Sequence, residues 1–258
     1  MKRAVKPCFI LVIVLSCASY MVILFDSRNY GIQNTVKVKP SISIVISHCK
    51  ESIRWIDNFL TSYCDLYHVK FIIYQKCDDL IPNRNISVYY DSCEVEEIIL
   101  PNVGRESHTF VHHLLRSNFS DINIFFQGHK HASDYNIIKK INKLLDLYTA
   151  GVEGPKWTPF NFQYCPFNHN WLDETDQEDK YCYWFSRVTN TSGSLQRCIN
   201  SVASYKGEFI ANQEALLNVV KDHKPVLLDM MNKLSLEDKP LEIYHIERLW
   251  YPFFWPYL

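Results

Sequence analysis

The chain has 258 residues, of which 47% are hydrophobic and 14% aromatic, with 27 basic and 28 acidic residues and a net charge of −1. This hydrophobic content is enough to bury a sizeable core, which excludes a wholly disordered chain. A nucleic-acid-binding protein needs a basic surplus or a basic stripe, so the charge balance argues against that class. The length suits one large domain or two small ones.

The N-terminal stretch predicts a membrane anchor. Lys2, Arg3 and Lys6 precede an uncharged, mostly apolar run over residues 8–25, which is about long enough to cross a bilayer. Because the flank is basic, we predict a cytoplasmic tail (1–7), a transmembrane signal anchor (8–25), a stem (26–40) and a lumenal domain (41–258). The alternative is a cleaved signal peptide and a secreted domain, since Ser16-Cys17-Ala18 has the small-x-small pattern of a cleavage site.

Both alternatives send the domain into the secretory pathway, and we expect it in the Golgi or the endoplasmic reticulum. Three glycosylation sequons, at Asn85, Asn118 and Asn190, agree with this localisation. Seven of the nine cysteines follow the apolar run, and most of them should form disulfides in an oxidising lumen. Because seven is odd, one is left free or bridges to another chain. No C-x-x-C pair occurs, which argues against a zinc ribbon or a thioredoxin-like site.

Strand and helix patterns alternate along the first half of the lumenal part. Apolar runs predict strands over residues 42–47 and 69–74, and shorter strands over 85–90 and 97–100. Apolar residues with helical spacing predict a helix over 53–60. Polar residues collect after the strands, so this order predicts a single α/β domain with a doubly wound, Rossmann-like sheet.

Residues 100–131 form the most informative stretch. A polar loop leads to Ser107, the predicted N-cap of a helix that contains Phe110 and Leu114. A strand follows over 122–126 and ends in the sequence QGHKH. Open α/β sheets place their sites where strands end in glycine and side chains able to bind ligands. His108 and His112 are four residues apart and could share a metal ion, but no carboxylate accompanies them in the usual place.

The second half changes in character. Helices are expected over residues 135–148, 213–220 and 226–234. Trp157, Trp171 and Trp184 either form stacking surfaces for sugar rings or pack a loop-rich core. The acidic run over 173–179 either holds a cation or forms a solvated loop. The apolar tail over 251–258 must be covered or must bind something.

Several segments resemble the family catalogued as domain of unknown function 3431. They are ISIVISHCKESIRWIDNFL, FIIYQKCDD, LPNVGRESHTFVHHLL, NIFFQGHKH, GEFIANQEAL and IERLW. The resemblance extends from Ile42 to Trp250, and the NVGRESHT and FFQGH blocks are its most specific parts. That family has no firmly assigned activity, so the resemblance does not settle the function.

A remoter resemblance is to family-2-type glycosyltransferases of the GT-A fold, in which similar blocks occur in the same order. The resemblance implies a nucleotide sugar as donor. It assigns donor binding to Glu51, Asp78, Asp79, Asn102, Gly104, Arg105, Gln127, Gly128 and His129. Where that family has an Asp-x-Asp motif for metal and diphosphate, this chain has Gln127-Gly128-His129. A divalent metal such as Mg²⁺ or Mn²⁺ would lose its hard oxygen ligands there. Three alternatives remain: His129 and Asp134 bind the metal, or cations such as Arg105 and Lys130 balance the charge, or activity is lost.

A carboxylate from the second half of the chain usually acts as the base in such transferases, and Glu208 and Glu247 are the candidates. Each also has a structural interpretation, as a helix cap or an ion pair. The preferred prediction is a type II membrane glycosyltransferase-like protein acting on a glycan or glycoprotein acceptor. The alternative is a non-catalytic glycan-binding or accessory protein on the same fold. A secreted hydrolase with paired carboxylates is a third hypothesis, which geometry alone can judge.

Overall fold

The computed structural model describes part of the chain. The described residues are 39–51, 63–77, 93–128, 135–150, 152, 154–160, 162–163, 175–189, 203–204, 208–236, 246, 249–250 and 252–254. They all belong to one compact unit, Val38–Leu258. The predicted anchor over 8–25 lies outside the described residues, as do the predicted helix over 53–60 and strand over 85–90. Within the described part, no helix combines the length and the apolar character needed to cross a membrane.

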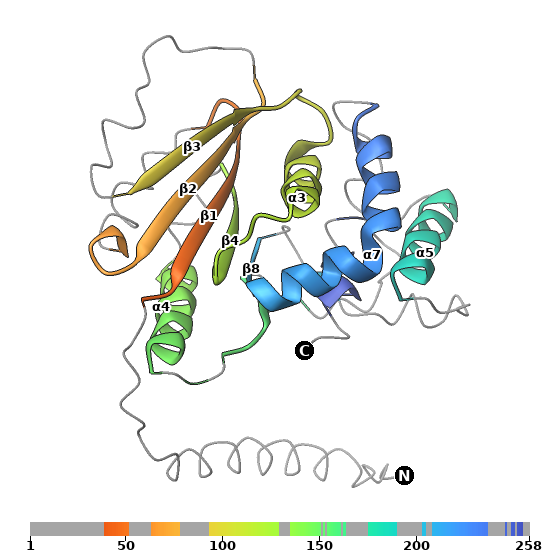
Figure 1. Ribbon diagram of the computed structural model, residues 1–258. Coiled ribbons are helices and arrows are strands. Elements are labelled where there is room, and N and C mark those ends of the chain that lie inside the picture. Colours follow the sequence, from red (N-terminus) through yellow and green to blue (C-terminus); the bar gives the residue numbers. More distant parts are fainter. Residues whose placement is uncertain are drawn as a thin grey trace, which may run out of the picture. The chain divides into compact units, whose positions relative to one another are not determined.

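A mixed six-stranded sheet forms the centre of the domain, with the strand order β3-β2-β1-β4-β8-β5 (Figure 1). The first four strands along the chain are mutually parallel, whereas β8 pairs antiparallel with β4 and β5 pairs antiparallel with β8. The strands are β1 (Ser41–His48), β2 (His68–Gln75), β3 (Glu94–Ile99), β4 (Ile122–Gln127), β5 (Trp157–Pro159) and β8 (Phe209–Asn212). A separate pair joins β6 (Phe162–Gln163) to β7 (Ala203–Ser204). The expected α/β class is confirmed, while the antiparallel extension was not expected.

Helices cover both faces of the sheet, and this explains why the central strands are apolar on both sides. Ile42, Ile44 and Ile46 of β1 face a core that includes helix α4 (Tyr135–Thr149). Val45 of β1 faces the opposite core, which helices α3 (Arg105–Arg116) and α7 (Gln213–Leu234) close. Figure 1 shows α4 on one side of the sheet and α3 with α7 on the other. The outcome is a three-layer α/β/α arrangement.

Helix α7 differs from the expectation of two helices over 213–220 and 226–234. It is one continuous helix of 22 residues with Pro225 inside it. A proline removes one backbone hydrogen bond and usually kinks a helix, and Figure 1 shows α7 changing direction partway along. Buried side chains on both sides of the proline keep the helix packed. The Asn212 side chain caps its start by accepting from the Ala215 N–H at 2.8 Å.

The aromatic residues of the second half pack inside the domain. Trp157 of β5 and Trp184 of helix α5 (Thr175–Thr189) are only 4% and 3% exposed. The core-packing interpretation is therefore correct for these two, and they offer no stacking surface for sugar rings. Trp171 lies outside the described residues. Residues 175–179 of the acidic run belong to α5, so the expected solvated loop is wrong for this part of the run.

Candidate functional site

The carboxyl ends of neighbouring strands meet at one edge of the sheet. After β2, the Lys76 N–H donates to the His48 carbonyl at 2.9 Å, and after β4 the Gly128 N–H donates to the Ser47 carbonyl at 2.7 Å. These bonds bring Lys76 and Gly128 to either side of the end of β1. The chain goes from β1 outward to β3 and then returns to the other side of β1 as β4. Such a switch point is where open α/β sheets bind ligands.

Glu51 lies beside Gly128 at this switch point. Its Oε2 accepts the Cys49 N–H at 2.8 Å, and its carbonyl accepts Nε2 of His48, also at 2.8 Å. A Cβ added to Gly128 would lie 3.0 Å from Glu51 Oε2 and 3.0 Å from the Ser47 carbonyl oxygen. A side chain at this position would therefore crowd both a carboxylate and the neighbouring strand, one of which would have to shift. The structure brings together these two predicted donor-binding residues.

We expect Gly128→Ala to lower the free energy of unfolding by about 1–3 kcal/mol, because the methyl group must displace the Glu51 carboxylate or the backbone of β1. Urea unfolding of the variant and the wild type measures this difference. Gly154→Ala is the matched control, since its methyl group meets the half-buried Tyr148 ring at 3.2 Å and no backbone atom. An equal loss in the two variants would contradict the packing described at Gly128.

Helix α3 begins at the same edge. Its N-cap is Gly104, with φ of 57°, and its first residue, Arg105, has φ of 45°. A Cβ on Gly104 would lie 2.8 Å from both Cβ and the carbonyl oxygen of Leu234, at the end of α7. The expectation that Ser107 caps the helix is wrong, because Ser107 lies inside its first turn and is buried. Asn102 lies before the helix and is exposed.

Lys76 connects the end of β2 to the start of α3. Its side chain is buried, since the residue is only 4% exposed. Its Nζ donates to the carbonyl oxygens of Val103 and Arg105, which flank the N-cap Gly104. Charge-assisted hydrogen bonds of this kind are stronger than neutral ones. The lysine therefore fixes the backbone that leads into the helix.

Glu106 lies in the first turn of α3, and its surroundings raise the pKa of its carboxyl group. Burial raises the pKa of Glu106, and the negative charge of Glu51 raises it further. Its own backbone N–H, Arg105 and Lys76 act in the opposite direction. Buried carboxyl groups with a raised pKa are frequent at catalytic sites because they exchange protons near neutral pH.

Glu208 immediately precedes β8 and is fully buried. Its Oε1 accepts the Gln127 N–H at 3.3 Å, and its carbonyl accepts the Phe160 N–H at 3.1 Å. The residue thus joins β8 to the ends of β4 and β5, next to the switch point. A catalytic role for Glu208 stays a prediction.

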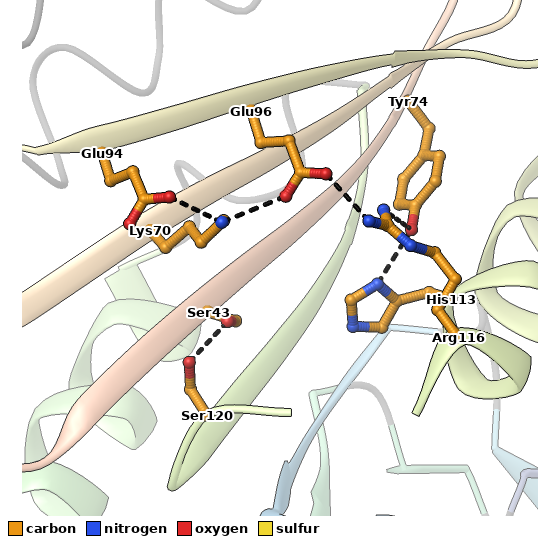
Figure 2. Close-up of polar contacts among 8 residues, drawn as sticks. All are labelled: Ser43, Lys70, Tyr74, Glu94, Glu96, His113, Arg116 and Ser120. Carbon is orange, nitrogen blue, oxygen red and sulfur yellow. Dashed lines mark hydrogen bonds and ion pairs between the residues drawn. The ribbon is translucent and has the colours of Figure 1, made fainter. Parts of the chain in front are cut away.

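The far end of α3 is fixed by a polar network, drawn in Figure 2. Arg116 contacts Glu96 of β3 at 2.9 Å, and Glu96 lies 3.1 Å from Lys70 of β2. Arg116 Nη1 also donates to Tyr74 Oη at 3.3 Å. The same oxygen also shares a hydrogen bond with Nδ1 of His113 at 2.9 Å. Lys76 and this network attach the helix to the sheet at both of its ends.

Two of the three histidines of α3, His108 and His113, are buried, and His112 is half-buried. Burial lowers the pKa of His113 to about 3 and that of His108 to about 4, so both are neutral near pH 7. His108 and His112 stack with ring centroids 6.5 Å apart. Among the residues that the structure describes, no group of three or more His, Cys, Asp or Glu side chains is arranged to hold a metal ion.

Two disulfides are present in the sheet region, which confirms the expectation of disulfide bonding. Cys49–Cys77 links the segments that follow β1 and β2, directly at the switch point. Cys64–Cys93 links the segments that precede β2 and β3, at the opposite end of the strands. Cys182 of α5 is also disulfide-bonded. The first bridge helps to hold the site, because Glu51 and Lys76 flank its two cysteines in sequence.

Several predicted residues lie outside the described part of the chain. They are the donor-binding Asp78 and Asp79, the metal candidates His129 and Asp134, the candidate base Glu247, and the sequon residues Asn85 and Asn190. Asn118 is described and is exposed just after α3, as glycosylation requires. Whether it is glycosylated stays a prediction.

Sequence reasoning missed Lys76 and Glu106. Lys76 follows a buried strand directly and precedes a cysteine, which was a usable signal for a side chain at the strand-end site. Glu106 stands next to the predicted Arg105 but gave no pattern of its own. Its raised pKa depends on burial and on Glu51, which is distant in sequence.

Comparisons with known proteins do not assign the chain to a family. No protein-family model matches the chain, and no curated protein matches it at a significant level. The resemblances to domain of unknown function 3431 and to GT-A glycosyltransferases therefore stay predictions. What the site binds is inferred from its own residues.

Proposed function

We propose that the domain is GT-A-like and transfers a sugar from a nucleotide-sugar donor to a glycan or glycoprotein acceptor. The observation that carries this proposal is a group of charged residues at the switch point between β1 and β4: Glu51 lies against Gly128, and Glu51, Lys76 and Arg105 all act on the Glu106 carboxyl group. Nucleotides bind at this place in doubly wound sheets. The order of the parallel strands, β3-β2-β1-β4, also supports it, because the doubly wound dinucleotide-binding order 3-2-1-4-5-6 begins in the same way.

The proposed roles follow from charge and position. Arg105 binds the donor diphosphate, because guanidinium groups match phosphate oxygens in charge and geometry. Glu51, together with Asp78 or Asp79, contacts the nucleoside. Glu106 accepts the proton of the acceptor hydroxyl while the sugar–oxygen bond to the acceptor forms and the bond to the diphosphate breaks. A raised pKa suits Glu106 better than an ordinary carboxyl for this task.

The proposed location is the lumen of the Golgi or endoplasmic reticulum, behind a single N-terminal membrane span. The disulfides Cys49–Cys77 and Cys64–Cys93 support an oxidising compartment. The residues described here do not supply a set of metal ligands. A divalent ion at the site would therefore need ligands such as His129 and Asp134.

We expect Glu106→Gln to lower the transfer rate by about 10²–10⁴-fold while donor binding is retained, because glutamine keeps the shape but cannot accept the proton. The assay incubates the full-length chain with a panel of nucleotide sugars and glycan acceptors and measures transfer and nucleotide release. Glu97→Gln, an exposed residue of β3, is the matched control. In the wild type, transfer should fall with decreasing pH at a higher pH than for an ordinary carboxyl group.

If the wild type binds nucleotide sugars and glycans but transfers and hydrolyses nothing, the enzyme proposal fails. The protein would then be an accessory glycan-binding protein on the same fold. If Glu106→Gln transfers sugar at the wild-type rate, the base lies elsewhere, and Glu208 and Glu247 become the residues to replace.

A further inference from the structure

The entry into α3 contains a strained backbone at Arg105. Gly104 and Arg105 are consecutive residues in the left-handed region, with φ of 57° and 45°. Glycine adopts this conformation without penalty, but a residue with a Cβ does so at a cost. Within the described residues, positive φ values occur at only one other residue with a side chain, Ser117. Strain of this kind persists only where the surroundings enforce it.

Lys76 is the group that enforces it. Its buried Nζ donates to the carbonyls of Val103 and Arg105, which precede and follow the Gly104 turn. The lysine is itself held in place, because its backbone N–H donates to His48 and the next residue, Cys77, is bonded to Cys49. Leu234 closes the other side of Gly104. The turn is therefore enclosed by β2 on one side and by α7 on the other.

The side chain of Arg105, at this strained position, faces solvent. Arg105 is exposed, and its guanidinium makes no hydrogen bond or ion pair with the residues that the structure describes. Its backbone, by contrast, is held by Lys76. The guanidinium acts electrostatically on Glu106, but none of the hydrogen bonds or ion pairs among the described residues holds it, so it can bind a ligand while its backbone stays fixed.

We infer that Lys76 is a positioning residue, which holds Arg105 in its left-handed conformation so that the guanidinium binds the diphosphate of a nucleotide ligand. The inference rests on the proposed function for the identity of the ligand. Beyond that function, the inference explains how the backbone conformation at Arg105 is held: a buried lysine binds the backbone at the start of helix α3. The left-handed conformation of Arg105 lowers the stability of the domain, and this loss is tolerated because the conformation serves ligand binding.

The test compares two replacements of the same side chain. Arg105→Gly removes the guanidinium and relieves the strain, whereas Arg105→Ala removes the guanidinium and keeps a Cβ in the left-handed region. We expect Arg105→Gly to raise the melting temperature of the full-length chain by about 2 °C relative to Arg105→Ala. Both should weaken the binding of inorganic pyrophosphate, measured by isothermal titration calorimetry, by at least about tenfold.

Lys76 is tested in two backgrounds. Lys76→Met should weaken pyrophosphate binding although Arg105 is intact, and Lys76→Arg should restore part of it. The loss in melting temperature caused by Lys76→Met should be smaller in the Arg105→Gly background, because the strain that the lysine opposes is absent there. If Lys76→Met alone is unfolded, Lys76→Arg is compared with the wild type instead, and an unchanged pyrophosphate affinity in Lys76→Arg would overturn the positioning role of Lys76.

Ser117→Gly is the matched control at the other end of α3, where φ is 53°. It should raise the melting temperature without changing pyrophosphate affinity. The inference is overturned if the wild type does not bind pyrophosphate, if the Arg105 variants bind it normally, or if Arg105→Gly melts no higher than Arg105→Ala. Pyrophosphate binding that depends on both residues, without transfer from any nucleotide sugar, would uphold the inference and remove the proposed function.

Discussion

Removal of residues 246–258 is expected to leave a chain that no longer unfolds cooperatively. The described side chains of this segment are fully buried: Ile246, Leu249, Trp250, Phe253 and Phe254. Each fully buried apolar side chain contributes about 1.5–3 kcal/mol, and the net stability of a domain is only about 5–15 kcal/mol. The truncated chain should lose its near-ultraviolet circular dichroism and its sharp urea transition.

The segment is essential because it completes the core on the α3 and α7 side of the sheet. Trp250 packs against Phe110 of α3 and Phe209 of β8, with ring centroids 6.3 and 5.3 Å apart. Phe254 stacks on Trp157 of β5 at 5.4 Å. The described residues of the apolar tail, 252–254, are therefore covered by the domain itself.

A matched pair of leucines tests the same packing without truncation. Leu249→Ala should cost about 2–5 kcal/mol, because Leu249 is 0% exposed, whereas Leu236→Ala should change stability by less than about 0.5 kcal/mol, because Leu236 is 74% exposed. Urea unfolding at pH 7.5 measures both values. Equal effects in the two variants would show that the C-terminal segment does not belong to the core.

A decrease in pH from 7.5 to 5.0 is expected to destabilise the domain through the histidines of α3. His113 and His108 are each 1% exposed, and burial lowers the pKa of the first to about 3 and of the second to about 4. The unfolded chain binds their protons near pH 6.5, so between that pH and the folded pKa values the unfolded state holds more protons. Stability is present above pH 6.5 and is lost as the pH falls, by about 2 kcal/mol for each histidine at pH 5.

His113→Asn isolates one of these contributions. The asparagine amide can take the place of Nδ1 in the hydrogen bond with the Tyr74 hydroxyl, but the side chain does not titrate. The decrease in the free energy of unfolding between pH 7.5 and 5.0 should therefore be smaller by about 2 kcal/mol in the variant. His68→Asn is the control, since His68 is exposed and its replacement should leave the pH profile unchanged. A variant as sensitive to pH as the wild type would show that His113 is not a buried neutral group.

The sheet was largely predictable from the sequence. The strand expected over 42–47 corresponds to β1, Ser41–His48, because a strand covered on both faces is a continuous apolar run. The short antiparallel strands β5 and β8 were missed because a few residues show no clear alternation. Two helices were predicted where the structure has α7 alone, because a proline usually ends a helix. In α7, packing on both sides of Pro225 outweighs the lost hydrogen bond.

The candidate site was predictable only in part. Gly104, Arg105, Gln127 and Gly128 stand out because they follow or precede regular elements, and the structure places them near one edge of the sheet. The roles of Lys76 and Glu106 depend on partners distant in sequence, and no local pattern reveals these. The N-cap prediction at Ser107 failed because a buried lysine, rather than a capping side chain, organises the start of α3.

The two disulfides of the sheet region overlap along the chain, since Cys64 lies between Cys49 and Cys77. Each closes a loop, with sequence separations of 28 and 29 residues, around the connection between two parallel strands. Parallel pairing normally requires such loops to close during folding, which is slow. In a denatured but oxidised chain these closures are already made, so part of the conformational search is complete before refolding starts. Refolding without reductant should therefore be faster than refolding of the reduced chain.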